Sequence, residues 1–589
     1  MTEYTAISFA PVQGFIEKSR KLRDLYGASL ILSHLSSKLV QKALCLGLEV
    51  ISPGLPTHPE GMPNRILIKG KFERNDVQNT LLQEWQRILR ICREWVEDNL
   101  GIPKEQYCWS QKEEEIGKHK GEWERWGSHT WEVFWGYSDS EKDAIKNAME
   151  DLETRKLKRD WVAINWMGES SSLTGTDAIA WHQLGRKLEK HEDPGQSLTP
   201  DEKDELELFY RRLSWLLDNP DYRIGKPCLS LEQLRQYEKD KKNNKDKPDD
   251  FGKYIAPNER LSIPELVKRL VTYDKIADEI RMEKLKKQKD DPEFKDINRE
   301  AGYWTGWFMG DGDKIGDKLQ KLASRHQDNP EQRDRELKRF TELMRNWGKD
   351  FQAKQDLFPA GKGRVIYAGG DDFLGVIYSE ESSTEKESEK IKPFEAFDWL
   401  LNLQNQWKDL QKILENELGF KNDGKHDNRF TFSVGFVWAG HQVPQRDILQ
   451  HCREAEKQAK SLGRNRVTIR IVFNSGQFVQ WTCPWHYLDI LTKYRDRDGK
   501  TLGENPNWNH IYSDWAQLKA RHAIELKDTT ENVNADLALA VFKLYFNDLI
   551  RFENQRQKIF KKNNSDTPQA IIQWIDGLVN VGWQLCSNT

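Results

Sequence analysis

The feature that most constrains the fold is the run GRVIYAGGDDFLGVIYS, which spans residues 363 to 379. Two apolar, strand-like segments flank Gly369-Gly370-Asp371-Asp372, and a pair of glycines readily makes the tight turn of a β-hairpin. Adjacent carboxylates on such a turn repel each other, so they usually need a partner. The hairpin therefore raises the question of whether that partner is water, a lysine or a metal ion.

The segments around this hairpin predict a ferredoxin-like unit. A buried-strand candidate at 302–312 ends at an Asp-rich turn, and strands at 429–440 and 465–473 follow the hairpin, each after a helix. The order is β-α-β-β-α-β and then α-β, and its first four strands match the ferredoxin-like plan. The helix before the hairpin has apolar residues spaced by three or four positions, which is an amphipathic pattern: Leu337, Phe340, Met344, Trp347 and Phe351.

The N-terminal part of the chain predicts a degenerate copy of the same plan. A strand at 4–10 and a long helical run precede strands at 64–70 and 131–137, with a helical stretch at about 72–100 inserted. No GGDD counterpart occurs there, so only one of two palm-like domains would carry the acidic residues.

The expected fold class is therefore α+β multidomain, with two ferredoxin-like palm domains and helical additions. We expect a first, non-catalytic palm at 1–138 and a helical middle domain at 139–300. The second, GGDD-containing palm would span 301–475, and a C-terminal helical domain 476–589. The charged stretches at 237–253 and 285–296 are too polar to bury and are expected to be loops.

Composition excludes several classes of protein. The 589 residues contain no apolar run of about 18, so no membrane span is expected, and the N-terminus lacks the features of a secretory signal, which favours a cytoplasmic location. The seven cysteines are scattered without any C-x-x-C pair, which argues against disulfides and a structural zinc site. A net charge of −3 does not by itself indicate nucleic acid binding, and the basic runs at 18–25, 155–160 and 556–564 are ordinarily solvated helix faces.

The acidic residues of the second palm are expected to meet at one edge of the sheet. In a β-α-β-β plan the end of the first strand lies beside the hairpin, which brings Asp311 and Asp313 near Asp371 and Asp372. Four carboxylates repel strongly unless divalent cations neutralise them, and Mg²⁺ prefers carboxylate oxygens while bridging phosphates. Two Mg²⁺ or Mn²⁺ ions at these four residues could activate a hydroxyl and stabilise a leaving pyrophosphate, as nucleotidyl transfer requires. Asp311, Asp371 and Asp372 are the candidate catalytic residues.

Nucleotide-binding residues are expected around this edge. Lys314 follows the D-G-D turn, and Lys460 and Arg464 lie at a helix end, where they could neutralise a triphosphate. Ser433, on the neighbouring strand, is a candidate for contact with the base. Glycine lets backbone and nucleotide approach closely, and the glycines concerned are Gly312, Gly369 and Gly370.

The motifs carry a family resemblance. AKSLGRNRV is similar to the end of nucleotide cyclase domains of the GGDEF type. More closely, residues 4 to about 485 resemble the large subunit of type III CRISPR–Cas effector complexes, in its III-B form. The phrases that carry this resemblance include ISFAPVQGFIEKSRKLRDLYGASLILS (7–33), WEVFWG (131–136), NERLSIPELVKRL (258–270), GDGDKIGDKL (310–319), YAGGDDFLGV (367–376) and TFSVGFVWAG (431–440).

The resemblance implies a partner set and a substrate. That family binds guide RNA within a multisubunit complex, together with backbone and small subunits. On recognising target RNA it converts ATP into cyclic oligoadenylate at the GGDD palm. The resemblance therefore implies ATP as substrate, guide and target RNA as partners, and no membrane association.

Two departures from the family pattern matter. The family often begins with a helical HD nuclease domain, whereas this chain starts at the first palm. Its His-Asp dipeptide, His426-Asp427, directly precedes a strand, so no HD nuclease is expected. The family also often carries two zinc-binding C-x-x-C pairs, and the corresponding places read Ser171-Ser172-Leu173-Thr174-Gly175 and Ser262-Ile263-Pro264-Glu265. Hydroxyls are poor zinc ligands, so no zinc is expected.

Two alternative functions stay open. The subunit could be a catalytically silent scaffold of the same ribonucleoprotein, although intact Asp311, Asp371 and Asp372 argue against decay of the site. It could also be a stand-alone GGDEF-type dinucleotide cyclase. GGDD in place of GGDEF, the second palm and the large helical additions argue against that interpretation.

Overall fold

The structure is a computed structural model. It describes residues 3–586 except 54–62, 111–120, 141–142, 159–168, 187–197, 221–227, 244–251, 283, 285–295, 298–301, 327, 354–356, 359–361, 380–390, 423–427, 497–506, 527–534 and 561–566, and it does not describe the side chains of 110, 241–243 and 353. The dipeptide His426-Asp427 lies outside the described residues. No helix within the described ranges has both the length and the apolar character needed to cross a membrane.

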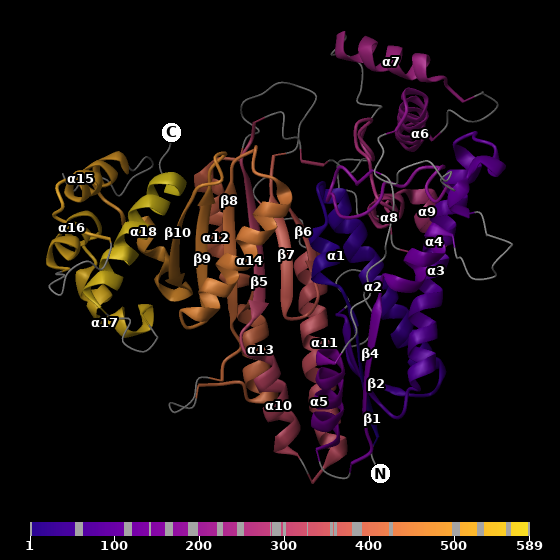
Figure 1. The fold of residues 1–589 in the computed structure, drawn as a ribbon. Coiled ribbons are helices and arrows are strands. Elements are labelled where there is room, and N and C mark those ends of the chain that lie inside the picture. The colour runs from indigo at the N-terminus through magenta and orange to yellow at the C-terminus, as the bar shows by residue number, and fades with distance from the viewer. Residues whose placement is uncertain are drawn as a thin grey trace. The chain divides into compact units, whose positions relative to one another are not determined.

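The chain divides into two compact units, each built around one sheet (Figure 1). One unit comprises Met1–Asp296 with His326–Glu342, and the other Ile297–Arg325 with Leu343–Thr589. The boundary between them falls inside one helix, α11 (Pro330–Ala353).

The first unit contains a four-stranded antiparallel sheet in the order β2-β3-β1-β4. Its strands are β1 (Tyr4–Ala10), β2 (Glu49–Ser52), β3 (Arg65–Lys69) and β4 (Glu132–Ser138). Three of these strands were predicted; the short strand β2 was not, because four residues give too little alternation to detect. The order 2-3-1-4 is that of a ferredoxin-like sheet, so the degenerate first palm is confirmed as a fold.

Helices complete the first unit. The helix α5 packs on β4 and β1 so closely that a Cβ on Gly136 would lie 2.3 Å from the carbonyl oxygen of Ala148. Three-residue 3₁₀ turns, η1 (Lys104–Gln106) and η2 (Cys108–Ser110), follow the long helix α3. The α-helices are α1 (Gln13–Glu17), α2 (Leu22–Cys45), α3 (Arg74–Asn99), α4 (Glu122–His129), α5 (Ala144–Leu157), α6 (Pro200–Asp218), α7 (Leu231–Asn243), α8 (Ile263–Leu270) and α9 (Asp274–Ile280).

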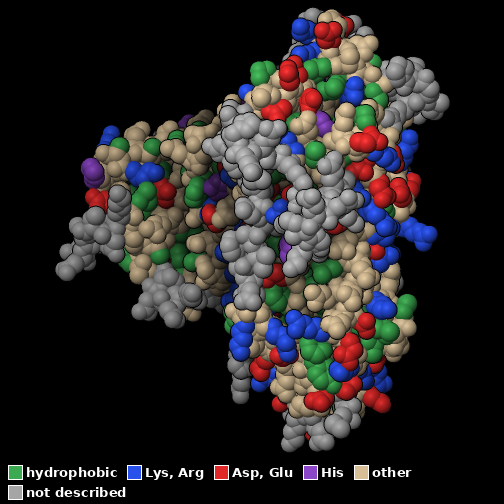
Figure 2. Space-filling view, turned by 45° about the vertical axis from the view of Figure 1, so that its right-hand side comes forward, with side chains coloured by type: hydrophobic (Ala, Val, Ile, Leu, Met, Phe, Trp, Pro, Cys, Tyr) green, Lys and Arg blue, Asp and Glu red, His purple; other side chains and the backbone are tan. Residues whose placement is uncertain are grey.

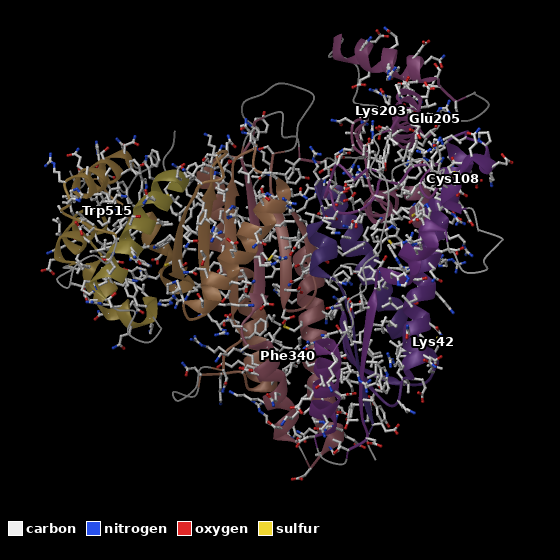
Figure 3. The ribbon with its side chains drawn as sticks, in the orientation of Figure 1. Lys42, Cys108, Lys203, Glu205, Phe340 and Trp515 are labelled. Atoms are coloured by element: carbon white, nitrogen blue, oxygen red, sulfur yellow. The ribbon has the colours of Figure 1, made fainter. Side chains whose placement is uncertain are left out.

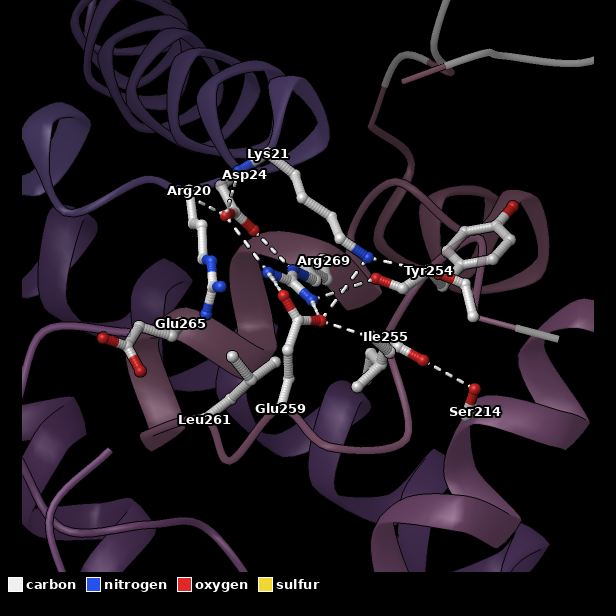
Figure 4. Close-up of polar contacts among 12 residues, drawn as sticks. Arg20, Lys21, Asp24, Ser214, Tyr254, Ile255, Glu259, Leu261, Glu265 and Arg269 are labelled. Carbon is white, nitrogen blue, oxygen red and sulfur yellow. Dashed lines mark hydrogen bonds and ion pairs between the residues drawn. The ribbon is translucent and has the colours of Figure 1, made fainter. Parts of the chain in front are cut away.

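A buried ion network joins α8 to the start of α2 (Figure 4). Arg269 is fully buried and donates to Asp24 Oδ1 at 2.6 Å and to Glu259 Oε1 at 3.1 Å. Lys21 lies 3.4 Å from Glu259, and Arg23 is buried with its guanidinium over the ring of Tyr254. Part of the basic run 18–25 is therefore buried inside the fold. The segments predicted as a first palm and a middle domain form one compact unit around this network.

The two segments where the resemblance places zinc ligands lie together in the first unit. Isolated β-bridges link Ser170 to Ala178 and Ile179 to Ser262. The hydroxyls of Ser171 and Thr174 donate to Glu265 Oε1 at 3.1 and 2.8 Å. Hydrogen bonds between protein groups thus connect the segments, and the absence of zinc stays a prediction.

The second unit contains a six-stranded sheet in the order β10-β9-β8-β5-β7-β6 (Figure 1). Strand β5 pairs antiparallel with both β7 and β8, whereas β8 and β9 run parallel. The four strands β6-β7-β5-β8 again show the ferredoxin-like order 2-3-1-4, as predicted. The strands are β5 (Thr305–Gly312), β6 (Arg364–Ala368), β7 (Asp372–Ile377), β8 (Phe432–Ala439), β9 (Arg466–Val472) and β10 (Phe478–Pro484).

Helices pack on this sheet and follow it. The helix α14 crosses β8 closely, since a Cβ on Gly435 would lie 2.3 Å from the carbonyl oxygen of Cys452. Trp515, labelled in Figure 3, is buried among the C-terminal helices, and its indole N–H donates to Asp576 at 2.7 Å. The helices are α10 (Ile315–Arg325), the second part of α11, α12 (Pro393–Leu403), η6 (Gln404–Trp407), α13 (Lys408–Leu418), α14 (Gln445–Ser461), η7 (Trp485–Lys493), α15 (Asn509–Ala520), α16 (Asp536–Phe546), α17 (Leu549–Ile559) and α18 (Pro568–Cys586).

The expectation that the chain becomes helical directly after 476 was wrong. Residues Phe478–Pro484 form β10, which pairs antiparallel with all of β9 and extends the sheet. The helix α18 covers β10, because a Cβ on Gly577 would lie 2.7 Å from the carbonyl oxygen of Gln480, and Trp574 donates to the Thr482 carbonyl at 3.0 Å. The C-terminal helices thus pack against the sheet through its edge strand.

The surface charge agrees with the composition. On the face seen in Figure 2, Lys and Arg side chains are interspersed with Asp and Glu, in keeping with the net charge of −3. No large region of one sign stands out on that face.

Candidate active site

Strand register brings the acidic residues of the second unit together. Asp311, near the end of β5, lies directly opposite Asp372, the first residue of β7. The turn between β6 and β7 is fastened by the Gly369 N–H, which donates to the Asp372 carbonyl at 2.9 Å. Gly370 has φ of +118°, a left-handed conformation that favours glycine. The Gly312 N–H donates to the Asp371 carbonyl at 2.7 Å and so ties the D-G-D turn to the hairpin.

These carboxylates lack enough positive charge around them. Burial, and then the neighbouring Asp371 and Asp311, raise the pKa of Asp372 to about 7. Burial is also the main cause of the raised pKa of Asp311. Tyr367 on β6 has its phenol pKa raised by burial and by the charges of the same carboxylates. The site therefore favours binding of a positively charged group or ion.

Lys460 on α14 supplies one positive charge directly. Its ammonium bonds Asp311 Oδ2 and lies 2.7 Å from Glu456 Oε1, one helical turn earlier on α14. Burial opposes the charge of Lys460, but the bonds to both carboxylates outweigh it and raise the pKa of the ammonium. Glu456 was not predicted; it is buried, which raises its own pKa. Its spacing of four residues from Lys460 was the signal that could have identified it.

Asp313 is held by hydrogen bonds from neighbouring protein groups. The hydroxyl of Ser433 donates to its Oδ1 at 2.7 Å, while the Thr431 hydroxyl at 2.7 Å and the Asn465 N–H at 2.9 Å donate to its Oδ2. Both oxygens of this buried carboxylate thus accept hydrogen bonds from the protein. This geometry disagrees with Asp313 as a metal ligand and with Ser433 as a contact to the base. Both residues instead fasten the D-G-D turn to β8 and to the start of β9.

The turn after α14 places Arg464. Three consecutive residues, Gly463, Arg464 and Asn465, have φ of +123°, +63° and +52°, and Asn465 is fixed by its bond to Asp313. The charge of Arg464 acts on Asp311 and opposes the rise of its pKa. Lys314 also has a positive φ, of +55°, and its side chain is exposed. Of the predicted basic residues, Lys460 and Arg464 are therefore close enough to Asp311 for their charges to act on it.

Arg345 on α11 is a charged residue that the sequence analysis missed. It is 5% exposed, burial lowers its pKa to about 10, and the charge of Asp372 acts against that fall. Arg345 adjoins Met344 in the predicted apolar stripe of its helix. A charged residue beside a buried stripe was the available signal.

The donor set suits a divalent cation. Asp311, Asp371 and Asp372 provide carboxylate oxygens at one edge of the sheet with unbalanced negative charge, which is the donor chemistry that Mg²⁺ or Mn²⁺ prefers. Among the described residues, no three His, Cys, Asp or Glu side chains already converge as a metal-binding group. The ammonium of Lys460 already occupies Oδ2 of Asp311.

The fold and the site together define a palm-type domain, a ferredoxin-like sheet with carboxylates at the end of its first strand and on its central hairpin. Residues 304–468 match the family model of the second palm domain of Cas10/Cmr2. Residues 4–60 match the model of the N-terminal domain of the CRISPR-associated protein Cmr2. Each unit thus contains a segment that is similar to a domain of the Cas10/Cmr2 proteins. No curated protein matches the sequence.

Several solved structures are similar over the whole chain. One is a Csm1-Csm4 cassette in complex with cA4, with 14% identity, a TM-score of 0.47 and coverage of 99% of this chain and 70% of that chain. Another is the same type of cassette with one ATP, with 14% identity, a TM-score of 0.43 and coverage of 99% and 70%. A third is Csm1 in T.onnurineus, with 13% identity, a TM-score of 0.44 and coverage of 100% and 70%. At TM-scores this low, the likeness carries no further inference about this chain.

Proposed function

We propose that the chain is the large subunit of a type III CRISPR RNA-guided effector complex of the III-B form, acting in the cytoplasm with guide RNA and backbone and small subunits. In this proposal the second palm converts ATP into cyclic oligoadenylate once target RNA is bound. The observation that carries the proposal is the pairing of Asp311 with Asp372 at the edge of a Cas10/Cmr2-type palm.

The reaction joins two ATP molecules. The 3′-hydroxyl of one attacks the α-phosphorus of the other and loses its proton to solvent as the new O–P bond forms. The bond from that phosphorus to the oxygen bridging to the β-phosphate breaks, and pyrophosphate leaves. Divalent cations, when bound, would lower the pKa of the attacking hydroxyl and neutralise charge on the pyrophosphate. Asp311, Asp371 and Asp372 would hold these cations in place of the four ligands first predicted, since Asp313 is occupied within the fold.

The basic and glycine residues would position the nucleotides. Lys460, Arg464 and Lys314 would neutralise the triphosphate around the acidic edge. Apart from its two chain neighbours, no described residue has a heavy atom within 4 Å of the place where a Cβ on Gly370 would be, which leaves room for a nucleotide to approach the hairpin. The backbone at Gly369 and Gly312 is already used to fasten the two turns.

The match of residues 4–60 to a Cmr2 N-terminal domain favours a subunit of a complex over a stand-alone dinucleotide cyclase. A silent scaffold in the same complex is the remaining alternative. The absence of a convergent metal-binding group among the described residues is the observation in its favour.

The test is incubation of the assembled complex with labelled ATP and Mg²⁺ or Mn²⁺, with and without cognate target RNA, followed by mass analysis of the products. Asp371→Ala with Asp372→Ala should lower product formation by about 100-fold or more, the effect of losing a major electrostatic element of a site. Asp409→Asn, which alters a carboxylate that is 90% exposed on α13, is the matched control and should behave as the unaltered chain. Near-normal product from the double variant would mean that these carboxylates only form a turn, whereas no product from the unaltered complex with target RNA would favour the scaffold.

A further inference from the structure

The ammonium of Lys460 lies between two carboxylates with different surroundings. Asp311 is at the acidic edge and its side chain is 35% exposed, whereas that of Glu456 is 10% exposed and lies on α14 itself. Lys460 bonds both at once, Glu456 at 2.7 Å. The same ammonium therefore has one partner inside the candidate active site and a second partner beside it.

The bond from Lys460 to Asp311 affects any cation that binds at the acidic edge. Asp311, Asp371 and Asp372 form a cluster of mutually repelling carboxylates, and the ammonium on Asp311 neutralises part of their charge. A divalent cation would use the same oxygen lone pairs, because carboxylate oxygens are its preferred ligands. An ammonium and a metal ion at Oδ2 of Asp311 repel each other and compete for the same oxygen.

We propose that Lys460 is a built-in counter-ion that a divalent cation must displace from Asp311, and that Glu456 keeps the displaced ammonium beside the site. This inference rests on the proposed function, since it takes Asp311 as a ligand of that cation. Lys460 and Glu456 are one helical turn apart on α14, so the ammonium can leave Asp311 without leaving Glu456. It then lies next to the acidic edge with donors available for a phosphate oxygen.

The counter-ion lowers the apparent metal affinity of the chain. A ligand that binds a state populated at one tenth shows about one tenth of its intrinsic affinity. Lys460→Gln should therefore tighten Mn²⁺ binding about tenfold. Glu456→Gln leaves Lys460 with Asp311 as its main partner and should weaken Mn²⁺ binding several-fold. Opposite changes in Mn²⁺ affinity from two substitutions one helical turn apart on α14 are a specific signature of this arrangement.

The experiment titrates Mn²⁺ into the full chain after chelation and dialysis, by calorimetry, with circular dichroism as the check on folding. Lys457→Gln is the matched control: it removes one positive charge from an exposed position on the same helix, three residues before Lys460. The control should change affinity by less than about twofold, the size of an exposed, screened charge effect. An equal gain from Lys457→Gln and Lys460→Gln would reduce the effect to general electrostatics and overturn the inference.

A double variant separates Glu456 acting through Lys460 from Glu456 acting on the metal. In the Lys460→Gln background, Glu456→Gln should have no further effect on Mn²⁺ affinity, because the group that it holds is gone. A persistent loss of Mn²⁺ affinity would mean that Glu456 is itself a metal ligand or acts on the metal through its charge. Either result would contradict the proposal. Mn²⁺ binding of equal strength with and without Lys460 overturns this inference alone, whereas no binding in any variant contradicts the proposed metal site as well.

A measurement without substitutions guards against a variant that fails to fold. Acetylation of lysines by limiting acetic anhydride, read by mass spectrometry, reports how accessible each amine is. Adding Mn²⁺ should raise labelling of Lys460 relative to Lys314, since Lys460 loses one of its two carboxylate partners. Unchanged relative labelling at a Mn²⁺ concentration that saturates the calorimetric site would refute displacement.

Discussion

Two aspartates that are separated by one glycine have different surroundings in this protein. Asp311 faces the acidic edge and bonds Lys460, whereas Asp313 accepts hydrogen bonds from Ser433, Thr431 and the backbone of Asn465. Asp311 can exchange its partner for an incoming cation, whereas Asp313 stabilises the D-G-D turn. Substitutions at the acidic edge should therefore change how stability depends on pH, whereas substitutions at Asp313 should lower the stability of the fold.

Asp372→Asn should stabilise the metal-free chain at pH 8 and leave it unchanged near pH 4. The pKa of Asp372 is raised from 3.8 to about 7, so between these values the folded state holds a proton that the unfolded state has lost. Stability of the unaltered chain therefore falls as pH rises through this window, and asparagine removes that fall. Melting temperatures from pH 4 to 8 in chelator measure it. A variant that melts below the unaltered chain at pH 8 would contradict the burial of a repelled carboxylate.

Asp313→Asn should destabilise the fold by about 2 kcal/mol or more, because an amide cannot accept hydrogen bonds from donors on both sides of a former carboxylate. Urea denaturation of the variant measures the loss. Asp409→Asn is again the matched control, since that carboxylate is exposed on α13 and paired to Lys412 only at 3.6 Å. Stability equal to the control would show that the bonds to Thr431, Ser433 and Asn465 contribute little.

At the scale of elements, close approach of two helices holds the first unit together. The helices α2 and α8 cross where Gly27 meets the carbonyl of Lys268, and the buried Arg269 then bonds Asp24 of α2. The ammonium of Lys268 caps backbone carbonyls of the segment before α2, among them that of Lys18 at 2.8 Å. Since these are contacts between residues about 245 apart in sequence, they connect segments that local patterning assigned to separate domains.

Gly27→Ala should destabilise the chain by about 1–3 kcal/mol, the usual cost of adding a methyl group to a filled core. The added Cβ would lie 1.8 Å from the carbonyl oxygen of Lys268, so α8 must move away from α2. Gly316→Ala on α10 is the matched comparison, because nothing lies within 4 Å of its Cβ position. It should stabilise by up to about 1 kcal/mol through helix propensity. Thermal unfolding of both variants measures the difference, and equal effects would contradict the close crossing.

At the scale of the whole molecule, both units contain strands in the ferredoxin-like order 2-3-1-4, and the central hairpin of the second unit carries Asp371 and Asp372. The second sheet is larger because β9 and β10 extend it beyond the ferredoxin-like core. The C-terminal helices depend on that extension, since α18 packs on β10.

A chain that ends at residue 475 should fold poorly or aggregate. It lacks β10, so β9 would expose a row of unpaired backbone groups at a new edge, together with apolar side chains that α18 and η7 cover. Sedimentation and thermal unfolding of the shortened chain, compared with the full chain, measure this. A soluble shortened chain with an unchanged melting temperature would mean that the second palm ends before β10, as the sequence analysis first placed it.

The sequence alone determined the local features of this protein. The alternation of strands and helices, the glycine-containing hairpin and the order of the second unit follow from side-chain periods and turn residues that act over a few positions. That order also places Asp311 beside the hairpin, because β5 and β7 are neighbouring strands and Asp311 pairs with Asp372 at one edge of the sheet. The basic residues Lys460 and Arg464 were found by the same reasoning.

The tertiary structure decided what depends on contacts between distant segments. The choice between Asp311 and Asp313 rests on which carboxylate meets donors from β8 and from the turn after α14, more than 100 residues away. The pairing of Lys460 with Glu456 and Asp311, the place of β10 in the sheet and the joining of α8 to α2 have the same origin. Side-chain direction and long-range packing are set by the whole fold, whereas turns and periodicity are set by neighbouring residues, and only the latter can be read along the chain.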